Sequence, residues 1–158
     1  MKWNTIHEKF INDAIKQAKL AYKKGEAPIG CVIVHEGNII ARGHNLRQTK
    51  NDVTLHAEMI ALRKACKKMK SWRLSDCDLY VTLEPCYMCA GAIIQARVRH
   101  VYFGALDPKG GAVVSKNTLF SLSHNHHVEA THILSEECGD LLRSFFRALR
   151  TNKPSNPL

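Results

Sequence analysis

Four side chains in two short segments of the 158-residue chain have the types and spacing of a catalytic metal site. His56 stands two positions before Glu58, and Cys86 and Cys89 follow a proline in a Pro-Cys-x-x-Cys sequence. Two thiolates and one imidazole suit zinc best, although iron or cobalt can take the same ligands. A structural zinc ion is usually closed by four protein ligands, whereas a catalytic one keeps a position for water. We therefore expect His56, Cys86 and Cys89 to hold one Zn2+ ion per subunit.

Glu58 has the chemistry of a proton carrier beside such an ion. Zinc lowers the pKa of a bound water from about 15.7 to about 7, so hydroxide becomes available at neutral pH. A carboxylate there can take the water proton and return protons to a ring nitrogen and to a departing amino group. H-x-E followed by P-C-x-x-C is the signature of zinc-dependent nucleobase deaminases, so the pattern predicts hydrolytic release of ammonia. Glu58 is the expected catalytic residue.

Two helix starts are expected to present these side chains. Apolar residues recur at helical spacing from Thr54, a suitable N-cap, to Met69, which places His56 and Glu58 in the first turn. A second helix is expected to begin at Pro85, because proline costs nothing where the amide has no intrahelical partner. Residues three apart at a helix start share a face, so this helix would bring both sulfurs to one side.

The rest of the chain alternates helices and strands. Helical spacing predicts further helices over residues 10–22 and 136–150, and β-branched apolar runs predict strands at 29–34, 38–41, 79–82, 100–104 and 128–134. This order predicts an α/β protein with three α/β/α layers, in which helices flank a mixed five-stranded sheet that opens with an antiparallel hairpin. We expect a single zinc-dependent deaminase domain over residues 1–150 and a flexible tail over residues 151–158.

Composition and charge indicate where in the cell the protein acts and what kind of partner it binds. No stretch approaches the ~20 apolar residues that cross a membrane, and the first residues lack the apolar segment of a signal peptide, so we expect a cytoplasmic protein without a membrane partner. In that setting the six cysteines favour metal binding and buried thiols over disulfides. The net charge of +9 favours an anionic partner such as a nucleic acid.

Beyond the metal motif, nearly the whole chain resembles the bacterial tRNA-specific adenosine deaminases of the cytidine deaminase superfamily. The similar segments are EAPIGCVIV, IIARGHN, HAEMIAL, WRLSDCDLYVTLEPCYMCAGAII, VYFGALDPKGGA, NHHVE and ECGDLLRSFFRALR. Many deaminases share the H-x-E and PCxxC elements. TLEPCYMCAGAI, the FGALDPKGGA loop and the FFR of the last helix are more characteristic of the tRNA enzymes. The resemblance implies a cytidine-deaminase-like fold.

The resemblance also implies an activity: hydrolysis of the C–N bond of a cyclic amidine, which converts adenosine to inosine at the wobble position of a tRNA, typically an arginine tRNA with an ACG anticodon. It implies a homodimer that binds the anticodon stem-loop. By position, Asn45 would hydrogen-bond the target adenine, and Asp107 and Lys109 would contact flanking nucleotides. Phe145 and Arg147 would help to hold the anticodon loop. A base in such a loop can be flipped out at low unstacking cost, which an enzyme acting on a base requires.

Simpler roles and other activities compete with this interpretation. Asn45 and Asp107 could merely form turns, Phe145 could belong to the core, and the arginines of the last helix could be a solvated face. A free-base or nucleoside deaminase, acting on guanine or cytosine, would need the same metal chemistry but no phosphate-binding surface. A non-catalytic RNA-binding zinc protein would have no need of Glu58. The basic last helix and the net charge favour RNA.

Overall fold

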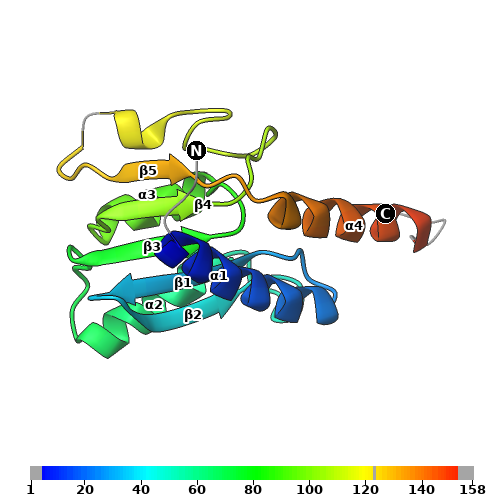
Figure 1. The fold of residues 1–158 in the computed structure, drawn as a ribbon, viewed down its shortest axis with the longest axis horizontal. Coiled ribbons are helices and arrows are strands. Elements are labelled where there is room, and N and C mark those ends of the chain that lie inside the picture. Colours follow the sequence, from blue (N-terminus) through cyan, green and yellow to red (C-terminus); the bar gives the residue numbers. More distant parts are fainter. Residues whose placement is uncertain (1–4, 123, 153–158) are drawn as a thin grey trace.

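The computed structural model describes residues 5–122 and 124–152. Along the chain its elements are α1 (Thr5–Lys23), β1 (Gly30–His35), β2 (Asn38–His44), α2 (Ala57–Met69), β3 (Cys77–Val81), α3 (Tyr87–Gln95), β4 (His100–Phe103), a 3-10 helix η1 (Leu119–Ser121), β5 (Glu129–His132) and α4 (Glu136–Asn152). Figure 1 shows the sheet as a middle layer, with α1 in front of it and α2 and α3 behind it. None of the helices in the described ranges is long and apolar enough to cross a membrane.

The sheet is mixed and has five strands in the order β2-β1-β3-β4-β5. β1 pairs antiparallel with both β2 and β3, whereas β3, β4 and β5 pair in parallel. The β1–β2 hairpin turns through Glu36 and Gly37, whose φ angles of 50° and 79° are the left-handed values that a tight two-residue hairpin requires. The prediction of an α/β/α protein with a mixed five-stranded sheet that opens with a hairpin is confirmed.

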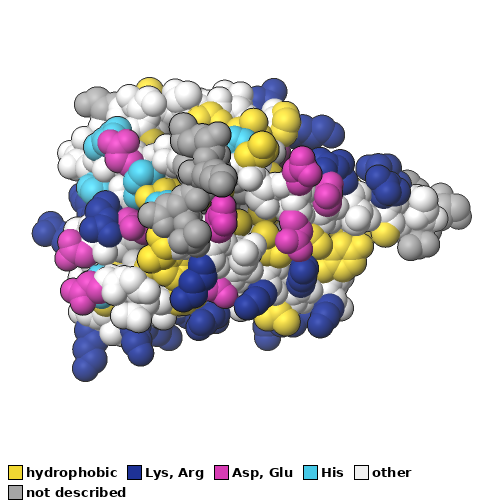
Figure 2. Space-filling view, viewed as in Figure 1, with side chains coloured by type: hydrophobic (Ala, Val, Ile, Leu, Met, Phe, Trp, Pro, Cys, Tyr) yellow, Lys and Arg dark blue, Asp and Glu magenta, His cyan; other side chains and the backbone are white. Residues whose placement is uncertain are grey.

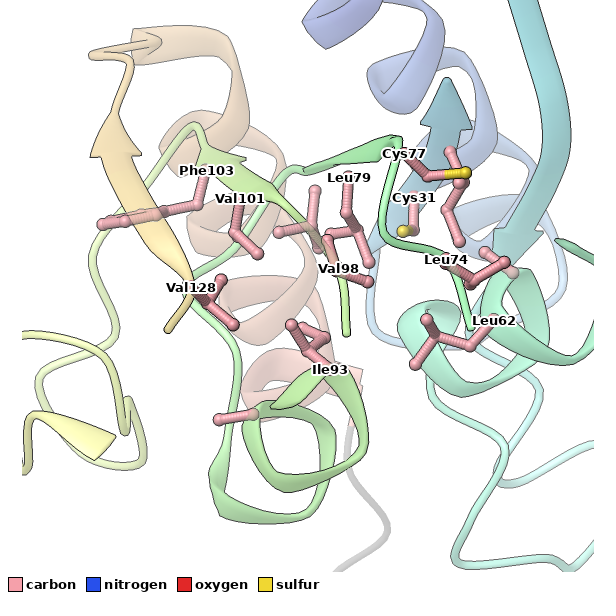
Figure 3. Packing of buried hydrophobic residues seen from close by; sticks show 14 of the residues in the cluster. Cys31, Leu62, Leu74, Cys77, Leu79, Ile93, Val98, Val101, Phe103 and Val128 are labelled. Atoms are coloured by element: carbon pink, nitrogen blue, oxygen red, sulfur yellow. The ribbon is translucent and has the colours of Figure 1, made fainter. Parts of the chain in front are cut away.

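Alternate side chains of the strands enter two cores. Ile33 faces α2 and α3 in the larger core, and its neighbour Val32 faces α1 in the smaller one. Successive side chains of a strand point to opposite faces, so a central strand with helices on both sides is apolar throughout. Figure 3 shows the larger core, where Val101 of β4 lies close to Ile93 of α3.

Strand register gathers several connections at one edge of the sheet. Val81, Phe103 and His132 are aligned at the carboxyl ends of β3, β4 and β5. The antiparallel strands reach the same edge, because Cys31 at the start of β1 pairs with Val81. Ligands of open α/β sheets bind outside the carboxyl ends of parallel strands, so this edge is where a site is expected.

Helix α2 begins later than the sequence predicted. Thr54 is not its N-cap, because the hydroxyl and the N–H of Thr54 both donate to Asp52 Oδ1, at 2.6 and 2.9 Å, and close a turn. The N-cap is His56, in an extended conformation, and the first helical residue is Ala57. His56 therefore stands at the helix entrance instead of inside the first turn.

Helix α3 also begins two residues after its predicted start. Pro85 lies before the helix, where its carbonyl accepts the N–H of Ala112 at 2.9 Å. The N-cap is Cys86, again extended, and Tyr87 is the first helical residue. The N-cap of each helix is thus a predicted metal ligand, His56 in α2 and Cys86 in α3. The positive ends of the two helix dipoles therefore both lie at the predicted metal site.

Helix α4 runs out from the edge of the sheet (Figure 1). Cys138 is the last residue of this helix that is buried, within the part of the chain whose side chains are described. Phe145 is half-buried and Phe146 is 44% exposed, so neither ring is fully buried in the core. The predicted flexible tail over residues 151–158 begins inside α4, and its residues 153–158 lie outside the described ranges.

Gly43 permits the contact between β2 and α2 that places the His56 end of that helix. A Cβ atom at Gly43 would lie 2.5 Å from the carbonyl oxygen of Ala57 and 2.9 Å from the amide nitrogen of Ala61. Both are backbone atoms of α2, so the helix would have to move. Gly43→Ala is expected to lower the free energy of unfolding by roughly 1–3 kcal/mol, measured by urea denaturation. Gly91→Ala is the control, because a Cβ there meets nothing within 4 Å; equal losses in both variants would contradict the explanation.

Candidate metal and catalytic site

His56, Cys86 and Cys89 converge at the entrances of α2 and α3. His56 Nδ1 lies 3.5 Å from Cys86 Sγ and 3.6 Å from Cys89 Sγ. All three ligand atoms lie within 4.8 Å of one another, and no other group of three or more His, Cys, Asp or Glu side chains in the described ranges does so. The three residues that the spacing singled out are therefore brought together.

The distances fit a tetrahedral ion. Metal bonds of about 2.3 Å to sulfur and about 2.1 Å to nitrogen, at tetrahedral angles, place the nitrogen about 3.6 Å from each sulfur. The donor set also fits, since hydrogen bonds from Cys89 and then from His56 lower the pKa of Cys86 to about 4 and make it a thiolate. The Cys89 thiol is held protonated by its bond to that thiolate and by burial, which raise its pKa. A zinc ion would take the place of the Cys89 proton, so that both sulfurs bind it as thiolates.

Glu58 lies next to this cluster on α2 and is only 4% exposed. Burial raises the pKa of its carboxyl group to about 7, because removal from water disfavours the charged form. The nearby Cys86 thiolate adds to this effect, and His56 opposes it. A carboxyl group with such a pKa can both accept and donate a proton at neutral pH, which is what a general acid/base needs.

A cavity of about 760 Å3 opens onto His56 at the edge of the sheet. Besides His56, its lining comes from five parts of the chain: Ala27 and Ile29 before β1, Asn45 and Arg47 after β2, Leu83 after β3, Leu106 to Lys109 after β4, and Leu142, Arg143, Phe146, Arg147 and Arg150 on α4. The floor is largely apolar, and the α4 wall carries arginines. The space can receive a planar apolar group with polar edges at the metal cluster, with an anion alongside.

Asn45 lines this cavity and is nearly buried. Its side chain also has a structural duty, because Oδ1 accepts the N–H of Ala57 at 2.8 Å and thereby caps α2. An amide has one carbonyl oxygen and one NH2 group. With Oδ1 occupied by a helix N–H, the Nδ2 group is the part of Asn45 that remains to donate to a ligand.

Asp107 and Lys109 form another wall of the cavity, on the loop after β4. The Asp107 carboxylate accepts hydrogen bonds from the N–H groups of Lys109 and Gly110, each at 3.2 Å. Asp107 therefore does form a turn, which is its simpler alternative role. The same turn directs both residues to the cavity. A role in the turn and a place in the lining are thus compatible for Asp107.

The two residues proposed on α4 are placed differently. Arg147 lines the cavity. The ring of Phe145 instead packs edge-on against Tyr22 of α1, with ring centres 5.9 Å apart, and its neighbour Phe146 lines the cavity. Figure 2 shows Lys and Arg side chains gathered beside α4 and near the end of α1.

Three other residues of the site were missed in the sequence. Arg47 lines the cavity, on the loop after β2. Glu26 and Glu84 are each only 1% exposed and bind loops that border the cavity. Glu84 lies inside the TLEPC segment, two residues before a metal ligand, and a charged residue in a run of otherwise apolar character was the available signal.

Comparison with known proteins agrees with this geometry. The family model of the MafB19-like deaminases matches residues 5–150. The tRNA-specific adenosine deaminase of Bacillus subtilis (strain 168) is 51% identical over 151 residues, which are 94% of this chain and 94% of that protein. The tRNA-specific adenosine deaminase of Aquifex aeolicus (strain VF5) is 45% identical over 92% of this chain and 97% of its own.

Solved structures show the same relation. A structure from work on A-to-I editing by tRNA:A34 deaminases at the wobble position of transfer RNA superposes with a TM-score of 0.82 at 46% identity, over 85% of this chain and 99% of that one. The guanine deaminase of Bacillus subtilis superposes with a TM-score of 0.62 at 34% identity, over 96% and 98% of the two chains. The chain belongs to the MafB19-like deaminases and, among them, to the family of tRNA-specific adenosine deaminases.

Proposed function

We propose that this protein hydrolyses adenosine to inosine at the wobble position of a tRNA anticodon, in the cytoplasm, with release of ammonia. The observation that carries the proposal is the single cavity that joins His56 of the ligand cluster to a wall of arginines on α4. A nucleobase at the metal ligands and a phosphate backbone at the arginines would occupy it together. The relatives' names and the A-to-I editing structure support the same substrate.

Each residue of the site has a part in this reaction. A zinc ion held by His56, Cys86 and Cys89 would supply the Lewis acid that activates water. Glu58 carries the two protons of the water in turn: the first, taken from the attacking water, it donates to a ring nitrogen of adenine, and the second, taken from the hydroxyl group added to the ring carbon, it donates to the amino group, which leaves as ammonia. Asn45 donates a hydrogen bond through Nδ2 to an acceptor on adenine. This bond keeps the amino group of adenine facing the ligand cluster.

The basic wall explains why the substrate is RNA and not a free base. A free base is small and uncharged, so it needs no arginines beyond the pocket that holds its ring. Arg147 and Arg150 on α4 and Arg47 on the loop after β2 line the same cavity and would hold the phosphates on both sides of a flipped nucleotide. The resemblance further supports an arginine tRNA with an ACG anticodon as the substrate.

The proposal is tested by measuring inosine and ammonia from anticodon stem-loops with adenosine at the wobble position. The panel includes the ACG loop, loops with changed flanking bases, and free guanine, cytosine and cytidine. Guanine belongs there because a guanine deaminase shares 34% identity with this chain. We expect turnover of the RNA and highest kcat/KM on the ACG loop. Turnover of a free base with none on any RNA would overturn the assignment.

Arg147→Ala is expected to weaken stem-loop binding and to reduce its salt dependence. Each phosphate contact that is lost lowers the slope of log Kd against log salt by about 1, because one fewer counterion is released. Binding by fluorescence anisotropy between low and high salt measures that slope. Lys68→Ala removes a positive charge from an exposed position of α2 outside the cavity lining and is the control. An unchanged slope in Arg147→Ala would exclude a phosphate contact there.

We also propose that the protein acts as a homodimer, as the resemblance implies. A second groove of about 650 Å3 runs between α2 and α3 and is lined by apolar residues that include Met59, Leu62 and Ala92. Trp72 at its rim is 57% exposed. A second copy of the chain would cover this apolar surface. Sedimentation equilibrium at micromolar concentration tests the proposal, and a monomer at all concentrations would contradict it.

A further inference from the structure

Glu84 is a buried carboxylate that has no part in the chemistry described so far. It precedes the ligand Cys86 by two residues and is 1% exposed. Oε1 accepts the N–H of Asp107 at 3.0 Å and the hydroxyl of Ser115 at 2.5 Å. Oε2 accepts three backbone N–H groups, those of Val113 at 3.1 Å, Val114 at 2.8 Å and Ser115 at 2.9 Å.

All five donors belong to one loop, residues 107–115, which leaves the carboxyl end of β4. The loop wraps so closely that a Cβ atom at Gly111 would lie 2.3–2.4 Å from the carboxylate atoms of Glu84. Five hydrogen bonds to two oxygens require an ionised carboxylate, since a carboxamide offers only one acceptor.

The loop carries one wall of the cavity. Asp107 and Lys109 line that wall, at the end of the loop that Glu84 Oε1 binds. On its other side Glu84 is joined through Pro85 to Cys86, the N-cap of α3 and a member of the ligand cluster. The side chain of Glu84 therefore links the segment that carries the metal ligand Cys86 to this wall.

We propose that Glu84 is a positioning residue, which fixes the Asp107–Lys109 wall relative to the metal ligands so that the wall binds the nucleotides flanking the target base. The proposal rests on the proposed function, because it assigns the wall to RNA. It makes a carboxylate at position 84 necessary for substrate binding without any contact to the substrate.

The test compares Glu84→Gln with the unchanged protein on the wobble-adenosine stem-loop. We expect KM to rise about tenfold or more, while kcat changes by less than about threefold and the zinc content stays the same. A role confined to folding would do the opposite: a smaller active fraction lowers apparent kcat and leaves KM where it was. Glu84→Asp, which keeps both acceptor oxygens, should recover part of the loss in KM.

A double-mutant cycle with Lys109→Ala tests whether Glu84 acts through the Asp107–Lys109 wall. If Glu84 acts through this wall, Glu84→Gln adds little to the rise in KM caused by Lys109→Ala. Glu26→Gln is the matched control, since Glu26 is also 1% exposed and accepts the N–H of Gln48 and the N–H and hydroxyl of Thr49, on a different loop, the one after β2. Its effect and that of Lys109→Ala should be additive.

The outcomes separate this inference from the proposed function. If the unchanged protein forms no inosine on any stem-loop, the proposed function fails and the role of Glu84 falls with it. If the unchanged protein is active and Glu84→Gln has a normal KM, only the positioning role is overturned. Where Glu84→Gln is too unstable to assay, Gly111→Ala displaces the same carboxylate and is read by the same KM criterion.

Discussion

Glu58→Gln is expected to lower kcat by about 10²–10⁴ while the protein keeps its fold and its metal. An amide can neither accept the proton of water nor deliver one, so both parts of the proposed proton transfer are lost. The fold should survive, because the buried site already accommodates a neutral acid: the pKa of Glu58 is raised to about 7. Glutamine is neutral and has nearly the same shape.

Inosine formation and zinc content, measured on the same preparation, test this expectation. Glu129→Gln is the control, since its side chain is 66% exposed on β5, away from the ligand cluster. It should match the unchanged protein in both measurements. An active Glu58→Gln protein would refute the mechanism, and an inactive one without zinc would show that the residue serves metal binding instead.

Removal of the metal is expected to abolish deamination and to lower thermal stability. The three ligand atoms join the entrances of two helices, so without an ion the Cys86 thiolate faces the buried Cys89 thiol with only His56 to compensate it. Activity should fall to background after dialysis against a chelator and return on addition of one equivalent of Zn2+. Full activity in a preparation shown to be free of metal would exclude the proposed chemistry.

A cysteine variant pair separates the ligands from other thiols. Cys86→Ser should lose both zinc and activity, because serine is a poor zinc ligand. Cys66→Ser is matched to it, since Cys66 is also a half-buried free cysteine, and it lies on α2 outside the ligand cluster. Its zinc content should remain one ion per chain. Equal zinc loss in both variants would indicate a general effect of cysteine replacement.

The metal ligands and the sheet were predictable because their signals are local. His56 and Glu58 lie two positions apart, and Cys86 and Cys89 lie three apart, so the spacing alone fixes which side chains can meet at a helix entrance. Strands buried on both faces appear in the sequence as unbroken apolar runs. The helix starts were misjudged because Thr54 is a good N-cap by type but is committed to Asp52.

The loop anchors were not predictable, because their partners are remote. Glu84 binds residues 23 to 31 positions further on, and Glu26 binds residues 22 and 23 positions further on. The charged residue in an apolar run marks Glu84 as unusual, but nothing local indicates which distant loop will bind its carboxylate. Phe145 and Phe146 show a second limit, since they are adjacent residues of the same type, and only the direction in which α4 leaves the sheet decides which one faces the cavity.

The exposed course of α4 affects how tightly RNA can be held. Past Cys138 the helix has no buried side chain in the described part of the chain, so its outer turns are maintained largely by their own backbone hydrogen bonds. Such turns open locally at a small fraction of the free energy that unfolds the sheet. A ligand that binds Arg147 and Arg150 must order these turns. The conformational entropy that the helix loses on ordering weakens the binding. The intrinsic helix-forming tendency of the last turns, in residues that never touch the nucleic acid, thus becomes a determinant of product release.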